Sequence, residues 1–267
     1  MGAEGHSDGT VGKALDVLDM VANHGRPVRF IDLLAQSPYP KATLYRLLQT
    51  LANQGMLHHE PDQGTYALGV RLVRLAHSAW AQSSLAPLAR PLVDALAQQT
   101  GETVHVAQLD RGQVLYVDKR SAIQSIEMFS QAGRVGPAYC TGVGKAMMAY
   151  LSADALQRAL TAQSFHPHTA HTLTSTDALL AELEQIRQDG HAFDREEHEP
   201  GIICCAVPIL ARSGSVLGGL SLTAHTARKS LNDLAEHASE LKRIAAEIAR
   251  NAENWRFPER NTEETNQ

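Results

Sequence analysis

The chain has 267 residues, and its 24 Lys and Arg against 29 Asp and Glu give a formal charge of −5. This length suits about two domains, and a hydrophobic share of 43% excludes a chain that is disordered throughout. The acidic balance excludes a uniformly basic nucleic-acid binder, so any contact with DNA must come from a local patch.

No stretch of the sequence reaches the about 20 consecutive apolar residues that cross a bilayer, and the first residues, MGAEGHSDGT, lack a signal-peptide pattern. The three cysteines have no disulfide-framework spacing, which fits a reducing compartment. Together these features predict a cytoplasmic protein without membrane contact.

The first seventy residues predict three helices followed by a β-hairpin. Apolar positions recur at helical spacing in 11–22, in 29–35 and from Pro40 to a stop at Gly55. Two strand-like runs, 56–59 and 65–68, then flank a turn sequence. This is the order of a winged helix-turn-helix, in which the third helix lies in the major groove and the hairpin touches the DNA backbone.

The third predicted helix separates apolar from hydrogen-bonding side chains. Its buried face should consist of Leu44, Leu47, Leu48 and Leu51. The opposite face is polar and belongs to a locally basic patch, 26–46, that contains a single acid, Asp32. The residues predicted to contact DNA are Arg29, Lys41, Ala42, Thr43, Tyr45, Arg46 and Gln49. A small helical bundle that contacts only proteins is the alternative.

The remaining chain mixes helices and strands. Helices are predicted at 70–81, 85–100, 144–151, 176–189 and 231–248, and strands at 103–109, 114–119, 202–210 and 216–223. Strands interspersed with helices in this way indicate an α+β, sensor-like domain.

The segment 139–146, YCTGVGKA, superficially resembles a phosphate-binding loop. Its glycine spacing is wrong, and Ala146 stands where a magnesium-binding Ser or Thr is required, so we do not expect a nucleotide site. A glycine turn that opens a helix exposes N–H groups that attract an anion, and a carboxylate is a natural guest. Tight packing of the helix against a sheet explains the same glycines equally well.

The segment 193–208, FDREEHEPGIICCAVP, has acids followed by an apolar run. The acids form either an acid–base cluster or, as is commoner, a solvated loop. Cys204 could be a nucleophile beside a histidine, yet cysteine in an apolar strand is usually a small buried hydrophobe. Alternation along a later strand puts Ser221 and Thr223 on one face, where two hydroxyls either hold a ligand or face water.

The histidines could indicate a metal site. His166, His168 and His171 lie in a polar loop without thiolate or carboxylate ligands at suitable spacing. His105 could approach Cys204, so a zinc ion shared by His105, Cys204 and Asp194 is a minor alternative to the expected absence of metal.

Residues 12–69 closely resemble the DNA-binding domain of the IclR family of bacterial transcription regulators, most densely at PKATLYRLL (40–48), QGML (54–57) and YALG (66–69). The resemblance continues to about residue 251. TGVGKA (141–146) looks like the glycine motif of the family's effector domain, and Glu197 with GIIC (201–204) looks like its glycine-cysteine motif. Ser221 and Thr223 match its paired hydroxyl positions.

The resemblance implies a GAF-like effector domain that binds a small organic acid, in a homodimer or homotetramer. Carried over residue by residue, it assigns effector binding to Met128, Gly142, Val143, Asp194, Cys204, Ser221 and Thr223. Beside an anion, Asp194 would accept a hydrogen bond from a ligand hydroxyl or be partly protonated. Ala224 and His225 stand where Gly-Pro is typical, so the identity of the acid stays open.

The sequence therefore predicts a winged helix-turn-helix at 9–70, a linker helix at 71–82, an α+β effector domain at 83–251 and a disordered tail at 252–267. The expected function is transcription regulation on double-stranded operator DNA, with repression relieved by the acid. Activation by the same architecture is the first alternative, and an enzyme that acts on a small carboxylate is the rival from another class. No catalytic residue, metal or cofactor is expected.

Overall fold

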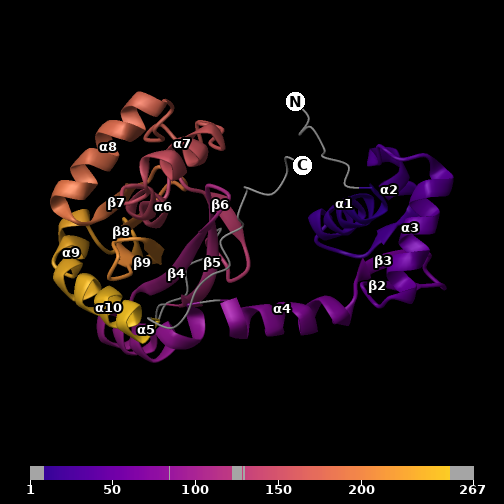
Figure 1. The fold of residues 1–267 in the computed structure, drawn as a ribbon, viewed down its shortest axis with the longest axis horizontal. Coiled ribbons are helices and arrows are strands. Elements are labelled where there is room, and N and C mark those ends of the chain that lie inside the picture. The colour runs from indigo at the N-terminus through magenta and orange to yellow at the C-terminus, as the bar shows by residue number, and fades with distance from the viewer. Residues whose placement is uncertain (1–8, 84, 122–127, 129, 253–267) are drawn as a thin grey trace. The chain divides into compact units, whose positions relative to one another are not determined.

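The structure is a computed structural model that describes residues 9–83, 85–121, 128 and 130–252. The chain divides into two compact units, Met1–Gln82 and Ser83–Gln267, each with its own hydrophobic core (Figure 1). None of the helices in the described ranges has both the length and the apolar character that crossing a membrane requires. All of the predicted disordered tail except residue 252 lies outside the described residues.

The N-terminal unit, indigo in Figure 1, is a winged helix-turn-helix, as predicted. Its elements are α1 (Gly9–Asn23), β1 (Val28–Arg29), α2 (Phe30–Gln36), α3 (Lys41–Asn53), β2 (Leu57–Glu60) and β3 (Thr65–Leu68), followed by α4 (Val70–Ser83). The three strands form an antiparallel sheet in the order β1-β3-β2.

The leucines of α3 join the helices of this unit. Leu44 and Leu48 have no exposed surface and belong to one core with Val17 of α1 and Leu33 of α2. Removing such side chains from water stabilises by about 1.5–3 kcal/mol each, which is what holds α3 against its neighbours. The second helix begins at Phe30, one residue later than predicted, because Arg29 is extended and pairs with Thr65 across β1 and β3.

The C-terminal unit is an α+β domain built on one antiparallel sheet. Its helices are α5 (Ala86–Thr100), α6 (Gly142–Met148), α7 (Ala153–Thr161), α8 (Thr176–Asp189), α9 (Leu231–Ala235) and α10 (Ala238–Asn251). Its strands are β4 (Thr103–Asp110), β5 (Gln113–Arg120), β6 (Val135–Pro137), β7 (Ala192–Arg195), β8 (Ile202–Leu210) and β9 (Val216–His225), in the sheet order β6-β5-β4-β9-β8-β7.

Helices cover both faces of this sheet. α5 and α10 pack on one face, while α6 packs on the other with α8 against it (Figure 1). Alternate residues of a strand point to opposite faces, so Cys204 of β8 faces α6 whereas Cys205 faces α10. The same alternation turns Ser221 and Thr223 of β9 towards the α6 side, and buries Leu220 and Leu222 on the other.

Several predicted elements needed correction. α6 begins at Gly142 and ends at Met148, not at 144–151; all seven of its residues are buried, so no amphipathic period marks its ends. The single closing helix predicted at 231–248 is two helices, and a capping box between Ser230 and Asp233 starts the first. The short elements β1, β6, α7 and β7 were not predicted.

Candidate ligand pocket and nucleic-acid interface

The predicted DNA-contacting residues lie together on the outer side of α3 and next to it. Lys41, Ala42, Tyr45 and Arg46 are exposed on α3, Thr43 and Gln49 are half-buried on the same helix, and Arg29 is exposed on β1. The buried leucines occupy the opposite side, so the separation predicted from the sequence is present in the structure. The two exposed basic side chains of α3, Lys41 and Arg46, suit contacts with phosphates and base edges.

Gln49 is engaged within the N-terminal unit. Its side-chain amide donates to the hydroxyl of Tyr66 on β3 at 3.2 Å. The Tyr66 ring is buried and stacks on His59 of β2, with ring centroids 4.5 Å apart. The bond therefore ties α3 to the hairpin, a role that the sequence pattern did not suggest.

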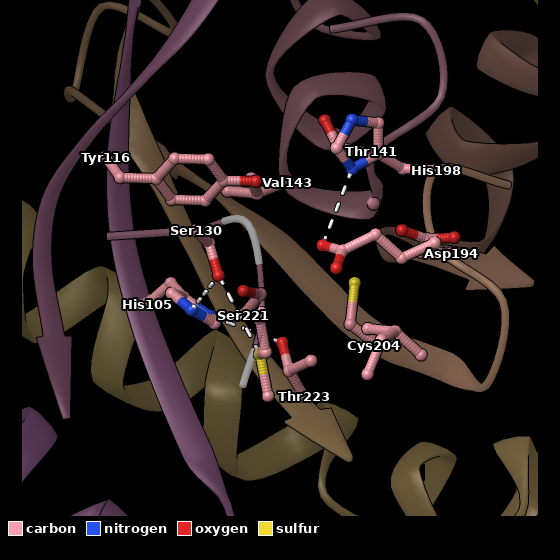
Figure 2. A pocket seen from close by; sticks show the side chains of 14 residues that line it. His105, Tyr116, Ser130, Thr141, Val143, Asp194, His198, Cys204, Ser221 and Thr223 are labelled. Atoms are coloured by element: carbon pink, nitrogen blue, oxygen red, sulfur yellow. Dashed lines mark hydrogen bonds and ion pairs between the residues drawn. The ribbon is translucent and has the colours of Figure 1, made fainter. Parts of the chain in front are cut away.

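The C-terminal unit has a pocket on the α6 side of the sheet that is lined by all seven residues assigned to effector binding. The other described lining residues are His105, Tyr116, Ser130, Thr141, His198, Glu199 and Ile202. The empty space between these residues, open solvent at the mouth included, is about 400 Å³. Figure 2 shows side chains from β4, β5, α6, β7, β8 and β9 converging on it.

The glycines of the α6 motif allow the helix to approach the sheet. A Cβ at Gly142 would collide with Sγ of Cys204 and lie 3.1 Å from the backbone nitrogen of Asp194. A Cβ at Gly144 would collide with the carbonyl oxygen of Ala138. The packing reading of this motif is confirmed, whereas anion binding stays a prediction for a helix whose Gly142 also lines the pocket.

His105 is a neutral hydrogen-bonding group in the pocket wall. Its Nε2 is 2.8 Å from Oγ of Ser130 and its Nδ1 is 3.3 Å from Oγ1 of Thr223 (Figure 2). Burial, with a smaller effect of the Lys119 charge, lowers the pKa of His105 to about 3. At neutral pH one ring nitrogen therefore donates and the other accepts.

Asp194 and Glu197 are buried, so the solvated-loop reading was wrong for these two acids. Oδ1 of Asp194 accepts a hydrogen bond from the backbone N–H of Glu197 at 2.8 Å. Burial and the nearby charge of Glu197 raise the pKa of Asp194 to about 7. A carboxyl group with this pKa exchanges its proton near physiological pH.

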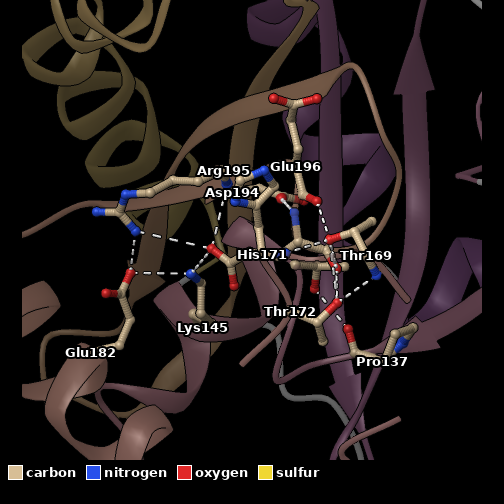
Figure 3. Close-up of polar contacts among 11 residues, drawn as sticks. Pro137, Lys145, Thr169, His171, Thr172, Glu182, Asp194, Arg195 and Glu196 are labelled. Carbon is tan, nitrogen blue, oxygen red and sulfur yellow. Dashed lines mark hydrogen bonds and ion pairs between the residues drawn. The ribbon is translucent and has the colours of Figure 1, made fainter. Parts of the chain in front are cut away.

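A buried ion-pair cluster lies beside Asp194. Nζ of Lys145, which has no exposed surface, is 2.5 Å from Oε1 of Glu197 and 3.1 Å from Oε1 of Glu182. Arg195 reaches the same Glu182 oxygen at 2.7 Å (Figure 3). This cluster fixes the loop after β7 against α6 and thereby positions one wall of the pocket. Lys145 is part of the glycine motif, but its partners Glu182 and Glu197 lie 37 and 52 residues further along the chain, so the local sequence did not indicate the cluster.

The chemistry of Cys204 does not suit a nucleophile. Burial, together with the nearby Asp194, raises the pKa of this thiol well above its usual range. An attacking cysteine needs the opposite shift, because the thiolate is the reactive form.

Several described histidines lie near one another or near the pocket. The His168 ring contacts both the His166 and His198 rings, with centroids 5.0 and 4.8 Å apart. Yet across the described ranges no three His, Cys, Asp or Glu side chains are arranged to hold a metal ion, and this includes the His105, Cys204 and Asp194 trio.

Comparisons with known proteins agree with this architecture. The family model described as IclR helix-turn-helix domain matches residues 10–61, and the model described as bacterial transcriptional regulator IclR C-terminal matches residues 77–250. The HTH-type transcriptional regulator KdgR of Escherichia coli K12 is 33% identical over 224 residues, which cover 84% of this chain and 85% of the relative.

Two further comparisons extend over nearly the whole chain. The transcriptional repressor IclR of Escherichia coli K12 is 27% identical over 238 residues, 88% of this chain and 87% of the relative. The crystal structure of Thermotoga maritima IclR matches with a TM-score of 0.72 and 28% identity, covering 91% of this chain and 98% of that one. The chain belongs to the IclR family of transcription regulators.

Proposed function

We propose that the chain binds operator DNA through α3 and the β2–β3 hairpin, and that a small organic acid in the C-terminal pocket controls this binding. The observation that carries the proposal is the convergence of residues from distant parts of the chain on one pocket. Met128, Gly142, Asp194, Cys204 and Ser221 are far apart in sequence, yet all of them line it.

The lining of the pocket supports a small acid with an apolar part. Hydroxyl groups of Ser130, Ser221 and Thr223 offer hydrogen bonds, while Met128 and Val143 offer apolar contact. None of the described lining residues is Lys or Arg. A carboxylate in this pocket would be bound by neutral donors.

The proposed mechanism is a shift between two conformations of a symmetric oligomer. An acid that binds one conformation better changes the population of the DNA-binding form by its difference in affinity. A homodimer is supported by large apolar side chains exposed on two helices, Val11 and Leu15 of α1 and Val70 and Val73 of α4. Two recognition helices would then read the two half-sites of one operator.

We propose repression relieved by the acid, supported by a relative that is named a repressor. The raised pKa of the Cys204 thiol supports binding without turnover, so the pocket is not expected to be catalytic. A cytoplasmic location is part of this proposal, because the operator DNA of a bacterium lies in the cytoplasm.

A thermal-shift screen of the full chain against keto, sugar and aromatic acids tests the pocket. An acid present at 100 times its Kd stabilises the protein by about 2.7 kcal/mol. For a unit of this size the melting temperature should rise by roughly 5–10 °C. The shift should be lost in Ser221→Ala and kept in Ser213→Ala, which changes an exposed turn. A shift that survives Ser221→Ala would contradict the pocket assignment.

Fluorescence anisotropy tests the DNA surface, with an operator duplex selected from random sequences. Arg46→Ala should weaken binding at least tenfold, whereas Arg243→Ala, which removes an exposed arginine of α10, should leave it unchanged. Equal affinities of the two variants at one fixed salt concentration would rule out α3 as the recognition helix.

A further inference from the structure

Asp194 is a carboxyl group that lies between the pocket and a buried cluster of charges. It lines the pocket and is only 6% exposed. One oxygen, Oδ1, accepts the backbone N–H of Glu197. In Figure 2 its side chain lies next to that of Cys204, on the side of the pocket opposite His105 and Ser130.

The nearest cations, buried Lys145 and exposed Arg195, are already paired with other carboxylates. Lys145 contacts Glu197 and Glu182, and Arg195 contacts Glu182 and, at 4.0 Å, Glu197 (Figure 3). Two cations and two carboxylates make this cluster neutral without Asp194. A negative charge on Asp194 would therefore be a surplus charge in a buried place, which is costly.

Titratable and charged groups reach Asp194 from every element packed around it. They are Tyr116 of β5, Cys140, Lys145 of α6, Glu197, His198 and Glu199 after β7, and Cys204 of β8. Burial and the charge of Glu197 raise the pKa of Asp194, and they outweigh the hydrogen bond from the Glu197 backbone N–H and the charges of Lys145 and His198, which lower it. The protonated form of Asp194 therefore prevails below about pH 7, and the two forms are about equally populated at neutral pH.

A carboxylate ligand makes the protonated form still more favourable. Beside an ionised Asp194 the ligand would place two like charges in a pocket whose described lining contains no Lys or Arg. A protonated Asp194 instead donates an O–H to the ligand's carboxylate, and such charge-assisted bonds are short and strong. The pocket can thus bind an anion without a cationic side chain.

We propose that Asp194 binds the acid effector as a neutral carboxylic acid, donating its proton in a hydrogen bond to the ligand's carboxylate, so that binding above neutral pH takes up one proton. The inference rests on the proposed function of the pocket. Asp194 would then select an ionised acid over its amide or ester, because a neutral carbonyl accepts the hydrogen bond from the Asp194 O–H less strongly than a carboxylate does.

Isothermal titration calorimetry of the full chain with pyruvate, gluconate and benzoate tests whether binding of an acid depends on pH in this way. These probes stay ionised between pH 6 and 9, so only the protein changes its protonation. For an acid that binds, Kd should be constant below about pH 7 and rise about tenfold per unit above it. At pH 8 the binding enthalpies measured in phosphate and in Tris should differ by the difference between the ionisation enthalpies of the two buffers, multiplied by about one proton taken up.

Variants identify the group that takes up the proton. Asp194→Asn keeps a neutral donor in the same place, so it should bind within a few-fold of the wild type at pH 6 and lose the pH dependence. His198→Gln and Glu199→Gln, which change two other titratable groups that line the pocket, should keep it. A pH-independent Kd in the wild type, or loss of the dependence in His198→Gln, would overturn the inference.

A second measurement needs no ligand. Because the folded chain holds a proton on Asp194 that the unfolded chain releases above about pH 4, wild-type stability should fall relative to Asp194→Asn from there to about pH 7 and then stay level. Parallel melting temperatures of the two proteins from pH 4.5 to 9 would overturn a protonated Asp194. If no probe binds at any pH, the proposed function fails for these acid classes, while the melting curves still decide the state of Asp194.

Discussion

At the scale of single residues, Lys145 shows how this domain tolerates a buried charge. α6 packs directly on the sheet and buries all seven of its residues, including this lysine. Removing an ammonium group from water costs several kcal/mol, and the two carboxylates of Glu182 and Glu197 offset that cost. The cluster therefore stabilises the fold only as long as it is complete.

Lys145→Met should destabilise the C-terminal unit by about 3–5 kcal/mol, because it leaves Glu197 buried beside an apolar side chain. Lys145→Met combined with Glu197→Gln should recover a large part of this loss, since no unpaired charge then remains. The free energy of unfolding in urea measures both. Arg243→Met, which breaks exposed pairs on α10, should change it by less than about 1 kcal/mol. Equal losses of unfolding free energy in Lys145→Met and Arg243→Met would show that the buried cluster contributes no more to stability than an exposed ion pair.

At the scale of elements, the hairpin and α3 of the N-terminal unit are joined by the Gln49–Tyr66 hydrogen bond. If that bond is the role of Gln49, Gln49→Ala and Tyr66→Phe should weaken operator binding to a similar extent. A single hydrogen bond of about 1 kcal/mol corresponds to roughly a fivefold change.

Binding to operator duplexes with single base-pair changes, measured by anisotropy, distinguishes positioning from base reading. Positioning predicts that both variants lose affinity equally for every duplex. A direct base contact by Gln49 predicts that only Gln49→Ala becomes indifferent to one base pair, because the lost bond carried that discrimination.

The elements differ in how far the sequence predicts them, and the reason is the environment of each. α3 has one buried and one exposed face, so its leucines repeat at helical spacing and its ends were nearly correct. α6 is buried on all sides, so it has no such period, and its start was placed two residues late. β7 has four residues, too few for alternation to be distinctive, and its place next to β8 depends on pairing across the sheet.

The pocket was predictable only where a local motif exists. Gly142, Ser221 and their neighbours were identified through a family resemblance that extends along the chain. Tyr116 and Ser130 carry no local signal, because they reach the pocket through the pairing of β5 with β4 and through contact with His105. The burial of Asp194 and Glu197 was likewise invisible, since a run of acids near a turn is normally solvated.

At the scale of the whole molecule, the chain divides into two units, and the core clusters described for them have no residue in common. The core of the N-terminal unit gathers around Leu48, whereas a core cluster of the C-terminal unit includes Leu183 of α8 and the residues of α6. Units with separate cores unfold as separate cooperative transitions unless a large apolar interface joins them.

Differential scanning calorimetry of core variants tests this independence. Leu48→Ala should cost the N-terminal unit about 2–5 kcal/mol and lower its transition by more than about 8 °C, because small domains shift by several degrees per kcal/mol. Leu183→Ala should lower the other transition instead, and an acid that binds the pocket should raise only that one. A single transition that moves as a whole in both variants would show that the units fold together, so that effector binding would stabilise the DNA-binding unit directly as well as through the assembly.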